Sequence, residues 1–119
     1  MTDHKTLLIG SYNARGSQNK QDYIGTLLNK VDIMCIQEHW LSESQLSLLG
    51  DIDDSFGYTG VSGFDNSNVL QGRPYGGCGI LWRLDIAHSV RMLTIDSKRL
   101  CAIRIERSEW KSCLCLLTL

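Results

Sequence analysis

The feature that most constrains the fold is a short apolar run, Ile33–Ile36, which stops abruptly at the polar pair Gln37-Glu38. Four consecutive apolar residues cannot alternate between a buried and a solvated face, so a strand made of them must be covered on both sides. Such strands are typical of parallel pairing, in which helices pack against the sheet. The run therefore predicts a buried, central strand.

The rest of the chain predicts an α+β fold. Thr6–Tyr12 alternates as a first strand, and Ser17 can cap a helix with an apolar stripe from Tyr23 to Leu28. Ser42 and Gln45 form a capping box for a second helix, which Gly50 ends. Five later segments have the pattern of strands: Gly57–Phe64, Gly77–Arg83, Ala87–Ile95, Arg99–Glu106 and Lys111–Leu119. We expect β-α-β-α followed by a mostly antiparallel meander, which makes one mixed sheet with helices on one face.

Composition limits the class of protein. With 119 residues, 43% of them hydrophobic and 21% charged, the chain is expected to be one globular domain over residues 1–119. The longest apolar run, Cys113–Leu117, is the length of a strand, so we expect no membrane span, and no secretory signal is visible. The five cysteines form no C-x-x-C pair and predict buried free thiols in an intracellular protein.

Two expected strands end in side chains that are able to hold a hard metal ion. Asn13 follows the first strand and Glu38 follows the second. A right-handed crossover between parallel strands would bring these ends together. One carboxylate and one amide oxygen suit Mg²⁺, or Mn²⁺, at a phosphodiester site. The alternative is that Asn13 forms a turn and Glu38 is a solvated residue before a helix.

Three motifs resemble those of the exonuclease–endonuclease–phosphatase superfamily. Leu8–Asn13 looks like its first motif and Ile33–His39 like its second, and Gly72–Arg83 is similar to a segment of the endonucleases of non-LTR (LINE-type) retrotransposons. The resemblance implies a four-layer sandwich of two sheets with helices outside. It also implies that Glu38 binds the catalytic Mg²⁺, that Asn13 orders the active site, and that Gln37 and His39 support them, with a phosphate contact as a second role for His39.

The same resemblance predicts a DNA-contact segment. Arg73 and Tyr75 are expected to touch the DNA backbone, and Gly76, like Gly77, leaves room for close approach of a ligand. Arg83 can also pair with phosphate. From Val69 onward the chain carries eight Lys and Arg against four acids, which is compatible with a surface that faces a polyanion.

Motifs that the family carries further along are missing, among them Gly-Asp-x-Asn and a terminal Ser-Asp-His whose His and Asp form the catalytic pair. The chain also stops inside the apolar segment Cys113–Leu119. We therefore expect a truncated amino-terminal half that is inactive alone, with one sheet whose inner face is uncovered.

Three functions remain open at this stage. The first is a fragment of a DNA endonuclease that nicks target sites, with a downstream reverse transcriptase domain in the same polypeptide and a nuclear place of action. The second is a phosphodiesterase or phosphatase acting on RNA or lipid. The third is a degenerate remnant without enzymatic activity.

Overall fold

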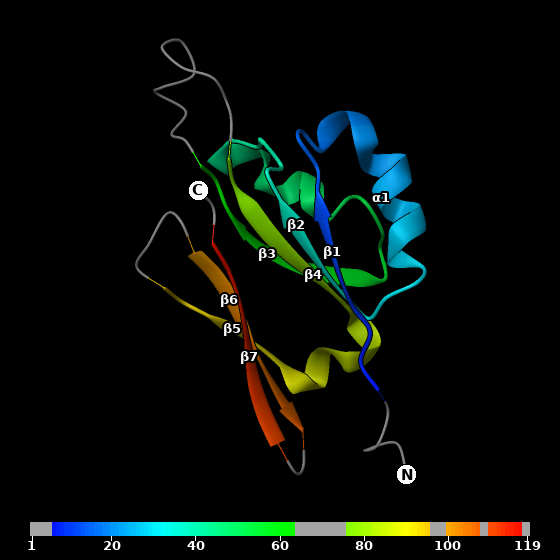
Figure 1. Ribbon diagram of the computed structural model, residues 1–119, viewed down its shortest axis with the longest axis vertical. Helices are drawn as coiled ribbons and strands as arrows, with labels where there is room; N and C mark the ends of the chain where they lie inside the picture. Colours follow the sequence, from blue (N-terminus) through cyan, green and yellow to red (C-terminus); the bar gives the residue numbers. More distant parts are fainter. Residues whose placement is uncertain (1–5, 64–75, 96–99, 108–109, 118–119) are drawn as a thin grey trace.

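The computed structural model of the chain describes residues 6–63, 76–95 and 100–107 in full and residues 110–117 by the course of their backbone. Two sheets and several short helices make up this part of the chain (Figure 1). The strands are β1 (Ile9–Asn13), β2 (Ile33–Gln37), β3 (Phe56–Val61), β4 (Cys78–Arg83), β5 (Val90–Leu93), β6 (Leu100–Arg107) and β7 (Trp110–Leu117). The helices are η2 (Gln18–Lys20), α1 (Gln21–Leu28), η3 (Glu43–Leu49) and η5 (Leu84–Ser89), of which only α1 is an α-helix.

The first sheet is mixed, as the sequence predicts. Its strand order is β1-β2-β4-β3, with β1 parallel to β2 and both remaining pairs antiparallel. The register sets Asn13 opposite Gln37 and Gln37 opposite Cys78. The carboxyl ends of β1 and β2 therefore meet the start of β4 at one edge of the sheet.

Strand β2 is buried on both faces, which confirms the interpretation of its apolar run. Met34 and Ile36 pack in a cluster with Ile24 and Leu28 of α1. Ile33 and Cys35 belong to a different cluster, which contains residues of β4 and β6. Because successive side chains of a strand point to opposite faces, each pair of β2 residues serves a separate core. Helices α1 and η3 thus cover one face of the first sheet, as the sequence predicts.

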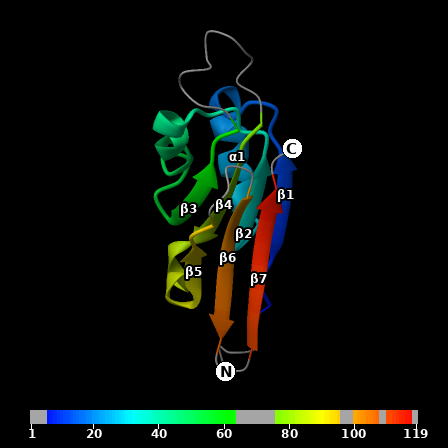
Figure 2. The same cartoon turned by 90° about the vertical axis from the view of Figure 1, so that its left-hand side faces the viewer.

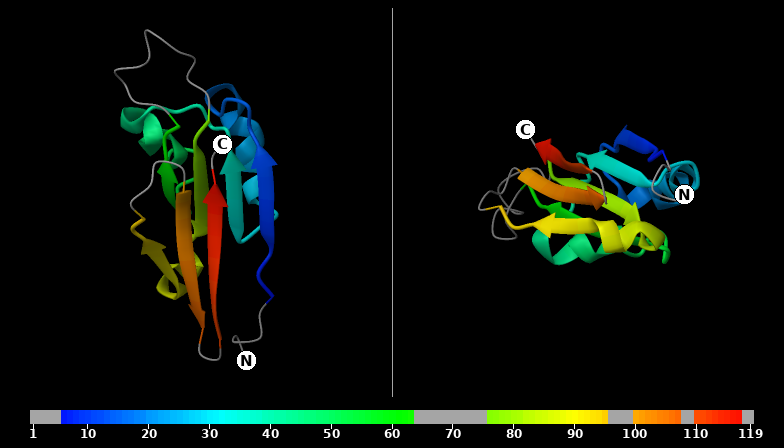
Figure 3. Two further views of the ribbon diagram at one scale, coloured as in Figure 1. Left: turned by 60° about the vertical axis from the view of Figure 1, so that its left-hand side comes forward. Right: turned by 90° about the horizontal axis from the view of Figure 1, so that it is seen from below.

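The other face is covered by a second sheet, and here the prediction of a single sheet is wrong. Strands β5, β6 and β7 form an antiparallel sheet of their own, which lies across the first sheet on the side away from α1 (Figures 2 and 3). Ile103 and Ile105 of β6 are 0% and 2% exposed and pack with Ile80 and Trp82 of β4, so the inner face that the sequence predicts to be uncovered is covered. The sequence does not reveal that the meander divides, because the period-two pattern of a strand is the same whichever sheet the strand joins.

Several local elements differ from the prediction. The second helix forms with its capping box, in which the Ser42 N–H donates to Gln45 Oε1 at 3.0 Å, but it is a 3-10 helix. Ser17 caps no helix with its side chain, and its hydroxyl instead donates to the carbonyl of His39. Residues 84–89, which start inside a predicted loop and run into a predicted strand, form η5. This helix carries the chain from the first sheet to the second.

The cysteines among the described residues agree with the prediction of buried thiols. Cys35, Cys78 and Cys101 are buried free thiols, with the sulfur atoms of Cys78 and Cys101 3.4 Å apart across the two sheets. Burial raises the pKa of the Cys35 thiol to about 11. Within the described part of the chain, no helix has the length and apolar character needed to cross a membrane.

Closure of the inner core by the second sheet has a measurable consequence. Ile103→Ala should lower the free energy of unfolding by about 2–5 kcal/mol, because it empties a fully buried position between the sheets. The matched control is Ile9→Ala on edge strand β1, where the side chain is 50% exposed, and it should cost less than about 1 kcal/mol. Urea unfolding of both variants measures the difference, and equal losses would contradict the two-sheet core.

Candidate functional site

Three chain segments meet where β1 and β2 end and β4 begins. Backbone hydrogen bonds join them: the N–H groups of Ala14 and Gly16 donate to the carbonyls of Gln37 and Glu38, at 2.8 and 2.9 Å. On the other side, the N–H of Glu38 donates to the carbonyl of Gly77 at 2.7 Å. The segment that carries Glu38 is therefore fixed on both sides by backbone hydrogen bonds, one set to the segment after β1 and one to the segment before β4.

Backbone strain is concentrated in these three segments. Within the described residues, all six that have a positive φ lie here: Arg15, Gly16, Glu38, Trp40, Gly76 and Gly77. Three of the six are not glycine, and a left-handed conformation costs such residues on the order of 1–2 kcal/mol each. Strain of this kind persists where the surrounding structure enforces it, which happens mostly at functional sites.

Asn13 and Glu38 lie together, as the sequence predicts for a parallel pair. Asn13 Nδ2 donates to Glu38 Oε2 at 3.4 Å, and the indole Nε1 of Trp40 donates to Oε1 of the same carboxylate at 3.4 Å. The Glu38 side chain is half-buried and Asn13 is exposed, so the pair faces solvent at the rim of the sheet. Each carboxylate oxygen retains a lone pair for a further partner.

His39 is fully buried and its ring is part of the framework of the site. Its Nδ1 accepts from the Leu41 N–H at 2.9 Å, so Nε2 carries the proton and donates to the carbonyl of Val61 at 2.9 Å. Burial is the main cause that lowers the pKa of His39. With both nitrogens engaged and no exposed surface, the ring supports the Glu38 segment and does not reach a phosphate.

The remaining predicted residues are placed as follows. Gln37 Nε2 donates to Ser11 Oγ at 2.9 Å in a hydrogen bond that is exposed to solvent. Gly76 is buried, and its carbonyl accepts from the Trp40 N–H at 3.0 Å. Arg73 and Tyr75 lie outside the described residues.

Arg83 does not belong to this site. Strand β4 runs antiparallel to β2, so its last residue lies at the opposite end of the sheet from Glu38. There Arg83 Nε pairs with Asp32 Oδ1 at 3.5 Å, and its guanidinium lies over the ring of Phe56. The prediction that Arg83 pairs with phosphate is not supported, because the side chain is engaged in holding the start of β2.

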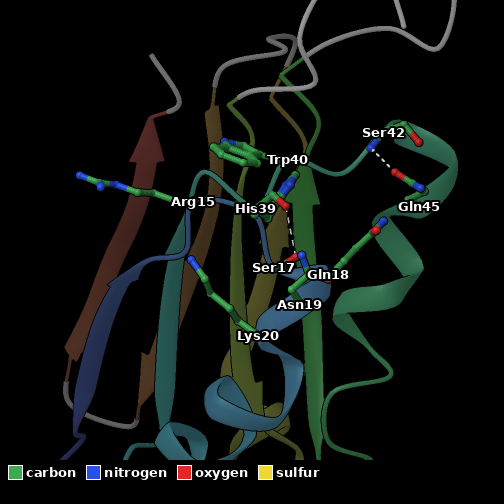
Figure 4. Close-up of a pocket in the computed structure, with 10 residues that line it drawn as sticks. Arg15, Ser17, Gln18, Asn19, Lys20, His39, Trp40, Ser42 and Gln45 are labelled. Carbon is green, nitrogen blue, oxygen red and sulfur yellow. Dashed lines mark hydrogen bonds between the residues drawn. The ribbon is translucent and has the colours of Figure 1, made fainter.

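A cavity of about 390 Å³ adjoins the Glu38 segment (Figure 4). Its lining combines one aromatic side chain with cations and small polar groups: Arg15, Gly16, Ser17, Gln18, Asn19, Lys20, His39, Trp40, Ser42 and Gln45. Arg15 is exposed, and Lys20 Nζ donates to the carbonyl of Ala14. Two cationic side chains, Arg15 and Lys20, therefore line the cavity.

Sequence reasoning missed Arg15, Lys20 and Trp40 as site residues. Trp40 is only half-buried, unlike Trp82 of β4, and it contacts Glu38. No sequence signal indicates this contact, because it depends on the left-handed φ values of Glu38 and Trp40. Arg15 and Lys20 stand in a polar stretch without a recognisable period, and nothing in the sequence distinguishes them.

The donor set fits a weakly held, hydrated, hard metal ion. Among the described residues no three His, Cys, Asp or Glu side chains come together, so they form no closed zinc-type cage. One carboxylate with an amide beside it, open to solvent, matches the ligands that Mg²⁺ takes when substrate phosphate and water complete its octahedron. Glu38 and Asn13 are the residues that would hold such an ion.

Comparison with known proteins identifies the family. A model of the endonuclease/exonuclease/phosphatase family matches residues 10–116, which is most of the chain. The chain therefore belongs to this family, whose members include nucleases and phosphatases. Comparison with curated protein sequences gives no match.

Solved structures confirm the fold. An AP endonuclease from Leishmania major superposes with a TM-score of 0.66 at 12% identity, over 90% of this chain and 38% of that one. A 3′ phosphatase from Neisseria bound to a product DNA hairpin gives 0.56 at 17% identity, over 91% and 40%. A mannosyl-6-phosphatase from Bacteroides thetaiotaomicron also gives 0.56 at 17% identity, over 91% and 49%. The chain thus spans less than half the length of each of these structures.

Gly77 is expected to be intolerant of substitution. Its φ is +87°, and an added Cβ would lie 2.2 Å from Cε1 of the buried His39 ring. Gly77→Ala should therefore lower the free energy of unfolding by about 2 kcal/mol or more. Gly25→Ala is the matched control: an added Cβ in the middle of α1 meets nothing closer than 3.9 Å, and the change should stabilise by about 0.5–1 kcal/mol. Urea unfolding compares the two, and an innocuous Gly77→Ala would contradict this geometry.

Acid should destabilise the chain through His39. Because the folded pKa is lowered from 6.5, the unfolded state binds a proton that the folded state excludes. The contribution of His39 to the free energy of unfolding is constant above about pH 6.5. Below that pH it falls by up to about 1.4 kcal/mol per pH unit. His39→Gln should remove this slope, because its amide is able to keep both backbone contacts, whereas the same change at exposed His88 should leave it. Urea unfolding midpoints measured across this pH range test the prediction. If His39→Gln left the pH dependence of stability unaltered, His39 would not be its source.

Proposed function

We propose that this chain is the amino-terminal, metal-holding part of a Mg²⁺-dependent DNA endonuclease. The observation that carries the proposal is the meeting of Asn13 and Glu38 at 3.4 Å on a strained, braced edge of the sheet. Two of the solved structures with this fold are named for action on DNA, one as an AP endonuclease and one bound to a product DNA hairpin.

The residues of this chain have distinct tasks in such a reaction. Glu38 binds the ion through its carboxylate, and Asn13 restrains that carboxylate by donating to Oε2. When bound, Mg²⁺ supplies charge neutralisation on the phosphate being attacked and lowers the pKa of coordinated water. Arg15 and Lys20, which line the adjoining cavity, offer positive charge to the phosphates of a strand that reaches Glu38.

The particular role we propose is target-site nicking by a non-LTR retrotransposon. Its basis is the resemblance of Gly72–Arg83 to the LINE-type endonucleases, which also makes Arg73, Tyr75 and Gly76 the proposed DNA-backbone contacts. In this proposal a further part of the protein supplies the catalytic Asp and His, and a reverse transcriptase domain follows in the same polypeptide. Action on chromosomal DNA would place the protein in the nucleus.

A second candidate function is phosphatase activity on a small molecule. It is favoured by the fold match to the mannosyl-6-phosphatase, whose TM-score equals that of the DNA-bound 3′ phosphatase. The metal-binding pair would serve both reactions. The two candidates differ in the substrate, since an extended DNA backbone makes use of cations spread along a surface and a sugar phosphate does not.

Nicking of supercoiled plasmid by a polypeptide that contains this chain with the rest of its domain tests the proposal. With Mg²⁺ present, Glu38→Gln should reduce nicking by about a hundredfold or more, because it removes the only charged ligand among the described site residues. Glu43→Gln, at an exposed position on the neighbouring η3, should have no effect.

Two outcomes would contradict the proposal in different ways. Retained nicking by Glu38→Gln would exclude the metal-ligand role. Hydrolysis of a sugar phosphate by the same polypeptide, with the plasmid left intact, would replace the endonuclease by the phosphatase.

A further inference from the structure

The indole ring of Trp40 is fixed between two segments of the site. Its six-membered ring lies over Gly16, where an added Cβ would come within 2.8 Å of Cε3. Its backbone N–H is bound to the carbonyl of Gly76 at 3.0 Å. Gly16 follows β1 and Gly76 precedes β4, so the Trp40 side chain and main chain are each held by a different neighbouring segment.

The backbone directs Glu38 and Trp40 toward each other. Both residues have left-handed φ values, 55° and 59°, on either side of the buried His39. Bulky residues seldom adopt this conformation. Here it makes the side chains of residues i and i+2 converge on a hydrogen bond of 3.4 Å between Trp40 Nε1 and Glu38 Oε1.

The Glu38 carboxylate thereby lies between two N–H donors from separate segments. Asn13 Nδ2 donates to Oε2 and Trp40 Nε1 donates to Oε1. A carboxylate that accepts at both oxygens is restrained in its rotation about the Cγ–Cδ bond, and each oxygen keeps a lone pair for another partner. Hydrogen bonds of this kind orient the ligands of metal sites and determine much of the affinity for the ion.

We propose that Trp40 is a positioning residue, which fixes the Glu38 carboxylate for the metal ion through its indole N–H. The inference rests on the metal site of the proposed function and adds a residue to it. Trp82 shows the contrast with a purely structural tryptophan: it is 6% exposed inside the core between the sheets. Trp40 is half-buried and lines the cavity (Figure 4). Its ring nitrogen donates to the Glu38 carboxylate.

Binding of Mn²⁺ to the 119-residue chain, followed by the electron paramagnetic resonance signal of the free ion, tests the proposal without any need for activity. Trp40→Phe keeps an aromatic ring over Gly16 and loses the N–H, and it should weaken Mn²⁺ binding about tenfold. Trp82→Phe is the matched control and should leave the affinity unchanged, although it alters the core. Glu38→Gln should abolish specific binding.

A second measurement examines the contact without metal. The Trp40 Nε1–H resonance in a ¹H–¹⁵N spectrum should shift in Glu38→Gln and stay in place in Glu43→Gln. Should Trp40→Phe fail to fold, a chain with benzothienylalanine at position 40 replaces it, because that side chain keeps both fused rings and lacks the N–H.

The outcomes separate the positioning role from the metal site itself. Mn²⁺ binding that Glu38→Gln abolishes and Trp40→Phe leaves intact overturns the role of Trp40, while the metal site stands. A Trp40 Nε1–H resonance that keeps its chemical shift in Glu38→Gln also overturns the role of Trp40. Equal, weak Mn²⁺ binding by the wild-type chain and Glu38→Gln overturns the metal site and, with it, the inference.

Discussion

Burial of β2 on both faces is the constraint on which the rest of the structure depends. A strand with Met34 and Ile36 on one side and Ile33 and Cys35 on the other is stable only between two covers. Helix α1 and η3 supply one cover and the second sheet supplies the other. The residue after β2, Glu38, is half-buried and lies at the rim between the buried interior and solvent. A carboxylate there is anchored by rigid elements and still accessible to an ion.

Strain and support coincide at this rim. Glu38 and Trp40 occupy left-handed conformations, and the carbonyls of Gly76 and Gly77 accept the N–H groups that keep them there. The free energy that these conformations cost is offset by packing elsewhere in the two cores. A solvated glutamate in a plain turn would need none of this. The geometry therefore agrees with membership of the endonuclease/exonuclease/phosphatase family and with the metal-holding role proposed for Glu38.

Local patterns predicted the elements whose surroundings are local. The apolar run of β2, its parallel pairing with β1, the capping box at Ser42 and the approach of Asn13 to Glu38 all follow from short-range spacing and strand order. The second sheet did not follow, because alternating strands look alike in either sheet. The phosphate contact predicted for Arg83 is not supported, because its partner is Asp32 at the far end of the sheet. Trp40 was not identified as a site residue, because its contact with Glu38 depends on a strained turn.

The shared carbonyl of Gly77 limits how this site could be moved into another protein. It accepts from both Glu38 and His39, at 2.7 and 3.4 Å, so the segment after β2 has its shape only when the start of β4 is in place. Grafting residues 37–42 alone onto a new scaffold would transfer the ligand without its conformation. A designer would have to transplant three strand ends together, with their spacing.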